Sequence, residues 1–141
     1  MTAMSPHRAS CRVLYGDTDA GGVVYYANYL RFFEFGRTEF MRDLVVPYAA
    51  LQEQGMILPV VECHCRYKAP ARYDDLLTVE TSLTKVKSVS CRFDYRLILE
   101  EQAKLLAVGF TVHAMVDREC KLMCMPASLI ALLEKVRTVA E

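Results

Sequence analysis

Two carboxylates and two glycines stand close together in residues 16–25, GDTDAGGVVY, just ahead of a long apolar stretch. A loop carboxylate such as Asp19 can activate water as a general base or attack a carbonyl carbon as a nucleophile. The N-terminus of a helix offers free backbone N–H groups and a positive dipole end, which stabilise an oxyanion. These residues therefore suit attack on a carbonyl group. From spacing alone, an ordinary aspartate that shapes a turn explains Asp19 equally well.

The helix that this chemistry needs is predicted over residues 27–46. An apolar stripe recurs there at three- and four-residue steps, at Tyr29, Phe33, Gly36, Phe40 and Leu44. Gly36 costs helix propensity within this stripe, so we expect another element to pack closely against it. Pro47 ends the helix, and residues 48–54 are expected to add a short helical turn.

Strands are predicted on either side of this helix. A short strand is expected over residues 10–15, and the hydrophobic period changes to about two beyond residue 57. Further strands are predicted over residues 57–69, 76–86, 89–100, 103–117 and 119–125, before a C-terminal helix that Pro126 opens. A sheet that wraps around the long helix buries it most simply, which is an α+β arrangement. Because no linker interrupts residues 1–141, we expect a single domain.

Charge and composition exclude several classes of function. The chain has 17 basic and 17 acidic residues, so its net charge of zero gives no reason to expect nucleic acid as a partner. No run of about 18 apolar residues is present, so membrane insertion is not expected. Residues 1–12 lack the apolar segment of a signal peptide, and a cytoplasmic protein is the default. The six cysteines are then expected to be reduced.

The segment Cys63-His64-Cys65 resembles a metal motif only superficially. On a strand the two thiols point to one face and the imidazole to the other, so the three cannot share one ion. We therefore expect buried structural thiols, no metal and no cofactor. The chain also lacks the G-x-S-x-G motif of serine hydrolases.

Residues 15–40, YGDTDAGGVVYYANYLRFFEFGRTEF, closely resemble the signature of the 4-hydroxybenzoyl-CoA thioesterase family. The likeness includes its Tol–Pal-associated acyl-CoA thioesterase branch. The downstream segments Pro59-Val60-Val61 and Tyr73-Asp74-Asp75 also match the layout of that family. The resemblance implies a hot-dog fold, in which a curved antiparallel sheet wraps a long central helix. It also implies homodimers or homotetramers with active sites between subunits.

The same resemblance implies hydrolysis of acyl-CoA thioesters and assigns roles to individual residues. The catalytic carboxylate falls on Asp19, and the backbone N–H that polarises the carbonyl falls on Tyr26. Gly21 and Gly22 would let the thioester approach the loop backbone. The remaining substrate contacts that it implies are Val60 and, toward the CoA nucleotide, Lys85, Lys87 and Ser88.

Other interpretations remain open beside this one. Members of the Tol–Pal branch commonly carry His where this chain has Tyr26, which leaves the exact subfamily open. Glu34 is a competing carboxylate, because another branch of hot-dog thioesterases places its acid on the central helix. None of the three histidines lies in the loop, which argues against the His-dependent dehydratases of this fold. The alternative function is a non-catalytic module that binds acyl-CoA or an acyl-carrier protein.

Overall fold

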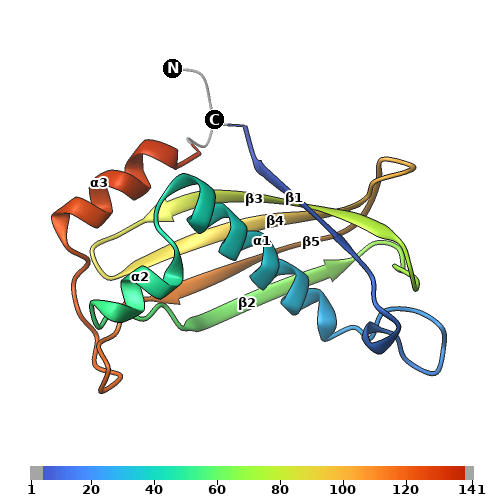
Figure 1. Cartoon of the computed structure of the whole chain (residues 1–141), viewed down its shortest axis with the longest axis horizontal. Coiled ribbons are helices and arrows are strands. Elements are labelled where there is room, and N and C mark those ends of the chain that lie inside the picture. Colours follow the sequence, from blue (N-terminus) through green and yellow to red (C-terminus); the bar gives the residue numbers. More distant parts are fainter. Residues whose placement is uncertain (1–4, 139–141) are drawn as a thin grey trace.

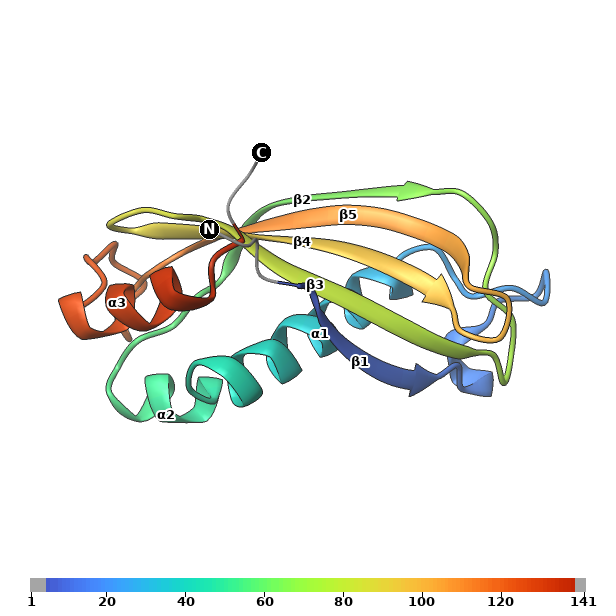
Figure 2. The ribbon, with the colours of Figure 1, turned by 90° about the horizontal axis from the view of Figure 1, so that it is seen from above.

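A computed structural model describes residues 5–138 as one curved sheet around a long helix (Figures 1 and 2). The elements in chain order are β1 (His7–Arg12), the single-turn helix η1 (Tyr15–Asp17), α1 (Asn28–Leu44), α2 (Tyr48–Glu53), β2 (Val60–Tyr67), β3 (Leu76–Val86), β4 (Ser90–Leu99), β5 (Lys104–Ala114) and α3 (Ala127–Val136). The five strands pair antiparallel in the order β1-β3-β4-β5-β2. This is the predicted α+β arrangement.

Helix α1 lies along the concave face of the sheet, as Figure 2 shows from above. Its sheet-facing side is apolar and buried, at Tyr29, Phe32, Phe33, Gly36, Phe40 and Met41. Alternate residues of β3 and β4 face it and are also buried. At the centre of this core the ring of Phe33 stacks on Tyr95, with the centroids 4.5 Å apart. The helix is thereby fixed in position by the sheet beneath it.

Gly36 lies where α1 comes closest to the sheet. A Cβ atom at this position would lie 2.5 Å from Val79 Cγ1 and 2.6 Å from Thr81 Oγ1. The close packing expected from the sequence is therefore confirmed, and it brings the middle of the helix directly onto β3. No side chain larger than a hydrogen atom fits there without movement of the sheet.

Two strand predictions were wrong in detail. Residues 119–125 form no strand, because the Asp117 carboxylate accepts hydrogen bonds from the N–H groups of Glu119 and Lys121 and closes a turn. Only an isolated bridge between Val116 and Leu122 follows. The first strand lies at His7–Arg12 rather than at residues 10–15, since the chain enters η1 at Tyr15.

The thiols are also less buried than expected. Cys91 is buried in the core, and burial raises the pKa of its thiol to about 12. Cys63, Cys120 and Cys124 are exposed, so the prediction of buried structural thiols fails for these three. Cys63 is exposed because β2 lies at an edge of the sheet.

A chain of buried polar groups crosses the core between β4, β5 and the segment before β2. The Tyr95 hydroxyl lies 2.6 Å from Thr111 Oγ1, which lies 2.9 Å from His113 Nε2. On the other side of the ring, Nδ1 of His113 donates to the Leu58 carbonyl at 2.9 Å. This arrangement fits a neutral imidazole, and burial lowers the pKa of His113 to about 4.

Substituting Gly36 tests the close approach of α1 to the sheet. Gly36→Ala should lower the free energy of unfolding by about 1–2 kcal/mol, because overpacking outweighs the gain of about 1 kcal/mol in helix propensity. Chemical denaturation measures the change. Gly16→Ala is the matched control, since its Cβ would meet no atom within 4 Å, and it should change stability little.

The buried His113 should make stability depend on pH. Its pKa is about 4 when folded and about 6.5 when unfolded, so the unfolded chain binds the extra proton between these values. The free energy of unfolding should therefore fall by about 3 kcal/mol as the pH drops from 7 to 4. Urea denaturation across this range measures it. His113→Gln, which cannot titrate, should show a shallower dependence; an equal slope would assign the effect to other groups.

Candidate active site

Asp19 lies at the tip of a tight hairpin formed by residues 18–24. Its backbone N–H donates to the Val23 carbonyl at 2.9 Å, and Gly22 donates back to the Asp19 carbonyl at 3.0 Å. The carboxylate Oδ1 accepts the Gly21 N–H at 2.8 Å, and Gly22 has a φ of +81° that suits glycine. Among residues 5–138, Oδ2 of Asp19 has no hydrogen-bond partner. The loop thus fixes the carboxylate through one oxygen and leaves the other for chemistry.

A hollow of about 610 Å³ opens beside this carboxylate. Tyr15 and Tyr73, whose rings meet edge to face at 5.8 Å, form its aromatic wall. Asp19 and Gly22 also line it. The side chain of Asp19 is exposed to this hollow, so a ligand in it would meet the carboxylate directly.

Asp17 holds the base of the hairpin to the start of α1. Its carboxylate is buried, accepts the Leu14 N–H at 2.8 Å and forms an ion pair with Arg31. Its backbone carbonyl accepts the Tyr25 N–H at 2.9 Å and the Asn28 amide at 2.9 Å. Four groups on both sides of the hairpin therefore meet at Asp17. Asp17 therefore shapes the loop.

The backbone at Tyr26 presents an unpaired donor at the start of α1. The Tyr26 carbonyl accepts the Tyr67 hydroxyl at 2.8 Å, and the Tyr25 carbonyl accepts the Asn28 N–H at 2.9 Å. Within residues 5–138, the Tyr26 N–H itself has no partner. A helix N-terminus with a free N–H stabilises negative charge on an oxygen. The phenol of Tyr26 points outward and is 62% exposed.

Asp19 and Tyr26 thus belong to one end of the molecule but line neighbouring hollows. Tyr26 and Tyr67 border a second hollow of about 300 Å³. The Tyr25 side chain connects the two: its ring lies 4.8 Å from that of Tyr26. A hydrogen bond with Tyr26 raises the pKa of Tyr25, and the Asp19 charge adds to that rise. Tyr25 is therefore the residue that adjoins both Tyr26 and the Asp19 carboxylate.

The other predicted substrate contacts lie at the opposite end of the sheet. Tyr67 contacts Tyr26, whereas Val60 begins the same strand seven residues earlier, about 23 Å away at about 3.3 Å per residue. Lys85 lies nine residues beyond Leu76, which pairs with Arg12 near the Asp19 loop. That separation is about 30 Å. No single subunit brings these residues to Asp19.

The basic end of the β3–β4 hairpin forms a hollow of its own. Its volume is about 230 Å³, and its lining includes three basic residues and one acid: Lys85, Lys87, Arg92 and Glu62. Ser88 does not line it; its carbonyl accepts the Met125 N–H at 2.8 Å. Of the three residues predicted to contact the CoA nucleotide, Lys85 and Lys87 therefore share this hollow and Ser88 does not.

Glu34 lies elsewhere again, on the exposed side of α1. It lines a hollow of about 320 Å³ between α1, α2 and residues 56–58. Along the helix axis it is eight residues from Tyr26, about 12 Å at about 1.5 Å per residue. Asp19 and Glu34 of one subunit therefore face different hollows.

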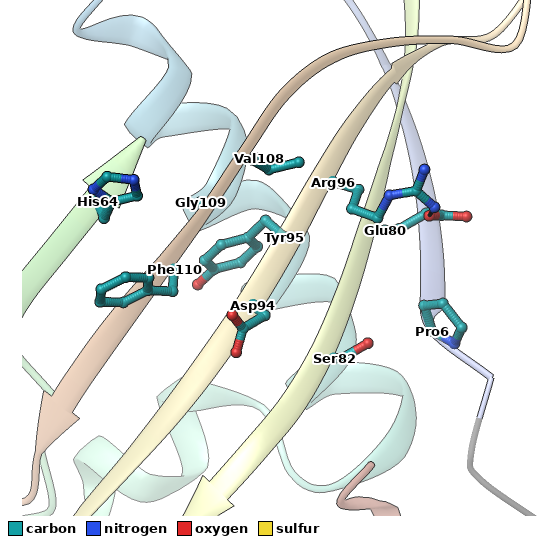
Figure 3. Close-up of a pocket in the computed structure, with 10 residues that line it drawn as sticks. All are labelled: Pro6, His64, Glu80, Ser82, Asp94, Tyr95, Arg96, Val108, Gly109 and Phe110. Carbon is teal, nitrogen blue, oxygen red and sulfur yellow. Dashed lines mark hydrogen bonds and ion pairs between the residues drawn. The ribbon is translucent and has the colours of Figure 1, made fainter. Parts of the chain in front are cut away.

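A further hollow of about 310 Å³ lies on the convex face of the sheet, away from α1 (Figure 3). Glu80 is buried there between Arg8, at 2.6 Å, and Arg96, at 3.0 Å. Asp94 is paired with Arg92 at 3.0 Å. The carboxylates of this face, Glu80 and Asp94, are thus already paired with arginines of the same chain.

Sequence reasoning missed two residues that position the site. Arg31 pairs with the buried Asp17, and its place one turn into a helix next to an acidic loop was a usable signal. Tyr67 holds the Tyr26 carbonyl, but 41 residues separate the two, and nothing local marks the contact.

Within residues 5–138, no three His, Cys, Asp or Glu side chains gather as metal ligands would. The helices of that same range include none with the length and apolarity needed to span a bilayer.

Comparison with known proteins identifies the family. The model of the thioesterase-like superfamily matches residues 13–133. The Escherichia coli (strain CFT073) acyl-CoA thioester hydrolase YbgC is 36% identical over 120 residues, which cover 85% of this chain and 90% of the relative. The Haemophilus influenzae acyl-CoA thioesterase YbgC is 47% identical over 88 residues, 62% of this chain and 65% of the relative.

Solved structures show the same architecture. A hypothetical protein from Thermus thermophilus superposes with a TM-score of 0.87 at 30% identity, covering 92% of this chain and 98% of that one. The BH1999 gentisyl-coenzyme A thioesterase superposes with a TM-score of 0.80 at 27% identity, covering 86% and 98%. With its curved sheet, central helix and matching sequence, the chain belongs to the thioesterase-like superfamily and has the hot-dog fold.

Proposed function

We propose that this protein hydrolyses acyl-CoA thioesters, with Asp19 as the catalytic carboxylate and the Tyr26 N–H as the oxyanion donor. The observation that carries the proposal is the pairing of a half-free carboxylate with an unpaired helix N–H at one end of the molecule. The names of the relatives, acyl-CoA thioester hydrolase and thioesterase, support the substrate class.

The proposed reaction uses each group once. The thioester oxygen accepts the Tyr26 N–H, which polarises the carbonyl and stabilises the charge that develops on oxygen. Asp19 removes a proton from water as the water attacks the carbonyl carbon; the C–S bond then breaks, and this proton passes from Asp19 to the sulfur, so that CoA leaves as the thiol. In the nucleophilic variant Asp19 attacks first and expels CoA as the thiolate, which takes a proton from water, and water then hydrolyses the mixed anhydride to regenerate Asp19. Both routes need the same placement of Asp19.

The proposed site is shared between two copies of the chain. Strand β2 is an edge of the sheet, and its exposed residues leave backbone groups unpaired on one side. Antiparallel pairing of β2 with its copy, centred on the strand, would set Val60 of one subunit opposite Tyr67 of the partner subunit. The distant substrate contacts of one subunit would then approach the Tyr26 end of the other. A homodimer, alone or within a tetramer, is the assembly that we propose.

Replacing each of the two carboxylates, Asp19 and Glu34, by its amide tests which one is catalytic. Asp19→Asn keeps an oxygen to accept the Gly21 N–H but cannot act as base or nucleophile. Its kcat should fall by about 10²–10⁴-fold with little change in KM, as measured by thiol release from acyl-CoA. Glu34→Gln should cost less than tenfold. A folded, inactive Glu34→Gln beside an active Asp19→Asn would place the chemistry on the helix instead.

A charge on the β2 edge tests the shared site. Val61→Lys should shift the protein from dimer to monomer in light scattering and remove most of its activity, because charge on an edge strand opposes pairing. Leu122→Lys is the matched control: Leu122 is 63% exposed and Val61 62%, but Leu122 lies off the edge. It should remain dimeric and active. A monomeric yet fully active Val61→Lys protein would contradict the shared site.

A further inference from the structure

The hollow between α1, α2 and residues 56–58 has no role in the chemistry proposed above. Its volume is about 320 Å³, enough for a short acyl chain. Met56, Ile57 and Leu58 make one side apolar, whereas Arg37 and Tyr48 make the other polar. Such a mixed lining suits a ligand with an apolar body and a polar end.

Among residues 5–138, Arg37 has no acidic partner at this hollow, and its guanidinium lies near the hydroxyls of Tyr48 and Tyr95. Two other arginines of α1 have acidic partners: Arg31 pairs with Asp17, and Arg42 with Glu39. Within residues 5–138, Arg37 forms no ion pair with any carboxylate. The only acid that lines the hollow, Glu34, is exposed, and water screens its charge.

The charge of Arg37 acts inward on the core. Burial, together with the charge of Arg37, lowers the pKa of His113 to about 4. The pKa of Cys91 is raised to about 12 by burial, against the opposing effect of Arg37. The half-buried Arg37 therefore lies close to the core as well as lining the hollow, and a partly buried position strengthens its attraction for an anion.

Tyr48 supplies a second unpartnered group. Its hydroxyl oxygen is buried, and among residues 5–138 it completes no hydrogen bond of good geometry, although the Arg37 guanidinium lies beside it. Burial raises the pKa of this phenol, and the nearby Arg37 opposes the rise. A buried polar group without a partner is costly, so a ligand oxygen that accepted this hydrogen bond would be favoured.

The hollow also lies where the shared site would need it. Leu58 lines it two residues before Val60, and its carbonyl is bound by His113, which pairs with Val60 across the sheet. In the dimer proposed above, this end of one subunit approaches Tyr26 of the partner subunit. An acyl chain held by its thioester at that N–H would extend toward the hollow.

We infer that this hollow receives the far end of the acyl chain, and that Arg37 and Tyr48 select acyl groups ending in a carboxylate. The guanidinium would neutralise the terminal carboxylate, and the Tyr48 hydroxyl would donate to one of its oxygens. The inference rests on the proposed function. It specifies a substrate class, the CoA monothioesters of dicarboxylic acids, and hydrolysis would release the free dicarboxylate and CoA.

Matched pairs of substrates test the inference. The full chain is assayed by thiol release with hexanoyl-CoA against adipoyl-CoA and octanoyl-CoA against suberoyl-CoA, which differ within each pair only in a terminal methyl or carboxylate. At one length or both, kcat/KM should favour the carboxylate by about 10–100-fold. Arg37→Gln should bring that ratio to about one. Arg42→Gln, on the same helix but outside the hollow, is the control and should keep the wild-type ratio.

Tyr48→Phe provides a second variant if Arg37→Gln does not fold. Because it removes only an unpaired hydroxyl, its melting temperature should not fall, while the ratio should drop by about 3–10-fold. Hydrolysis without any preference for the carboxylate, or a preference that survives both substitutions, overturns the inference and leaves the proposed function standing. No hydrolysis of any of the four substrates overturns both.

Discussion

The close contact between α1 and the sheet is the constraint on which the site depends. At Gly36 the helix backbone approaches β3 so closely that a methyl group would overlap Val79. The sheet has a matching glycine, Gly109 of β5, where a Cβ atom would lie 2.5 Å from the ring of Phe33 on α1. These two contacts fix both the depth and the rotation of the helix. The position of its first turn, and so of the Tyr26 N–H, follows from packing in the middle of the core.

The lengths of the strands explain why the proposed site needs two subunits. A sheet long enough to cover α1 separates the two ends of each strand by some 20–30 Å. The loop that carries Asp19 lies at one end, and the basic hairpin and Val60 lie at the other. Folding within a single chain cannot close this gap, whereas antiparallel pairing at β2 reverses one copy relative to the other. In the proposed dimer, pairing at β2 both covers the open edge of the sheet and brings the two parts of the site together.

The sequence predicted what local chemistry and periodicity govern. The apolar stripe of α1 and the close packing at Gly36 were both visible, because helical spacing and propensity report on burial directly. Residues 119–125 misled the prediction, because apolar residues alone do not reveal that Asp117 closes a turn. The loop with Asp19 could be found through its resemblance to a family signature.

Contacts between residues far apart in the sequence could not be predicted from the sequence alone. The bond from Tyr67 to Tyr26 joins residues 41 positions apart, and no spacing rule marks it. Arg37 looks like any surface arginine of a helix until its lack of an acidic partner is seen. Val60 and Lys85 could be named from the resemblance, but their distance from Asp19 required the sheet itself.

The network around Asp17 has a consequence for how such an enzyme can diversify. Its contacts with Leu14, Tyr25, Asn28 and Arg31 all fall outside residues 18–24, so they clamp the hairpin at its base without involving its tip. The tip of the hairpin can therefore change without disturbing its attachment to the helix. Changes there that keep Asp19 and its contact with Gly21 can reshape the hollow beside the carboxylate while the helix start stays in place, so this loop can alter selectivity on an unchanged scaffold.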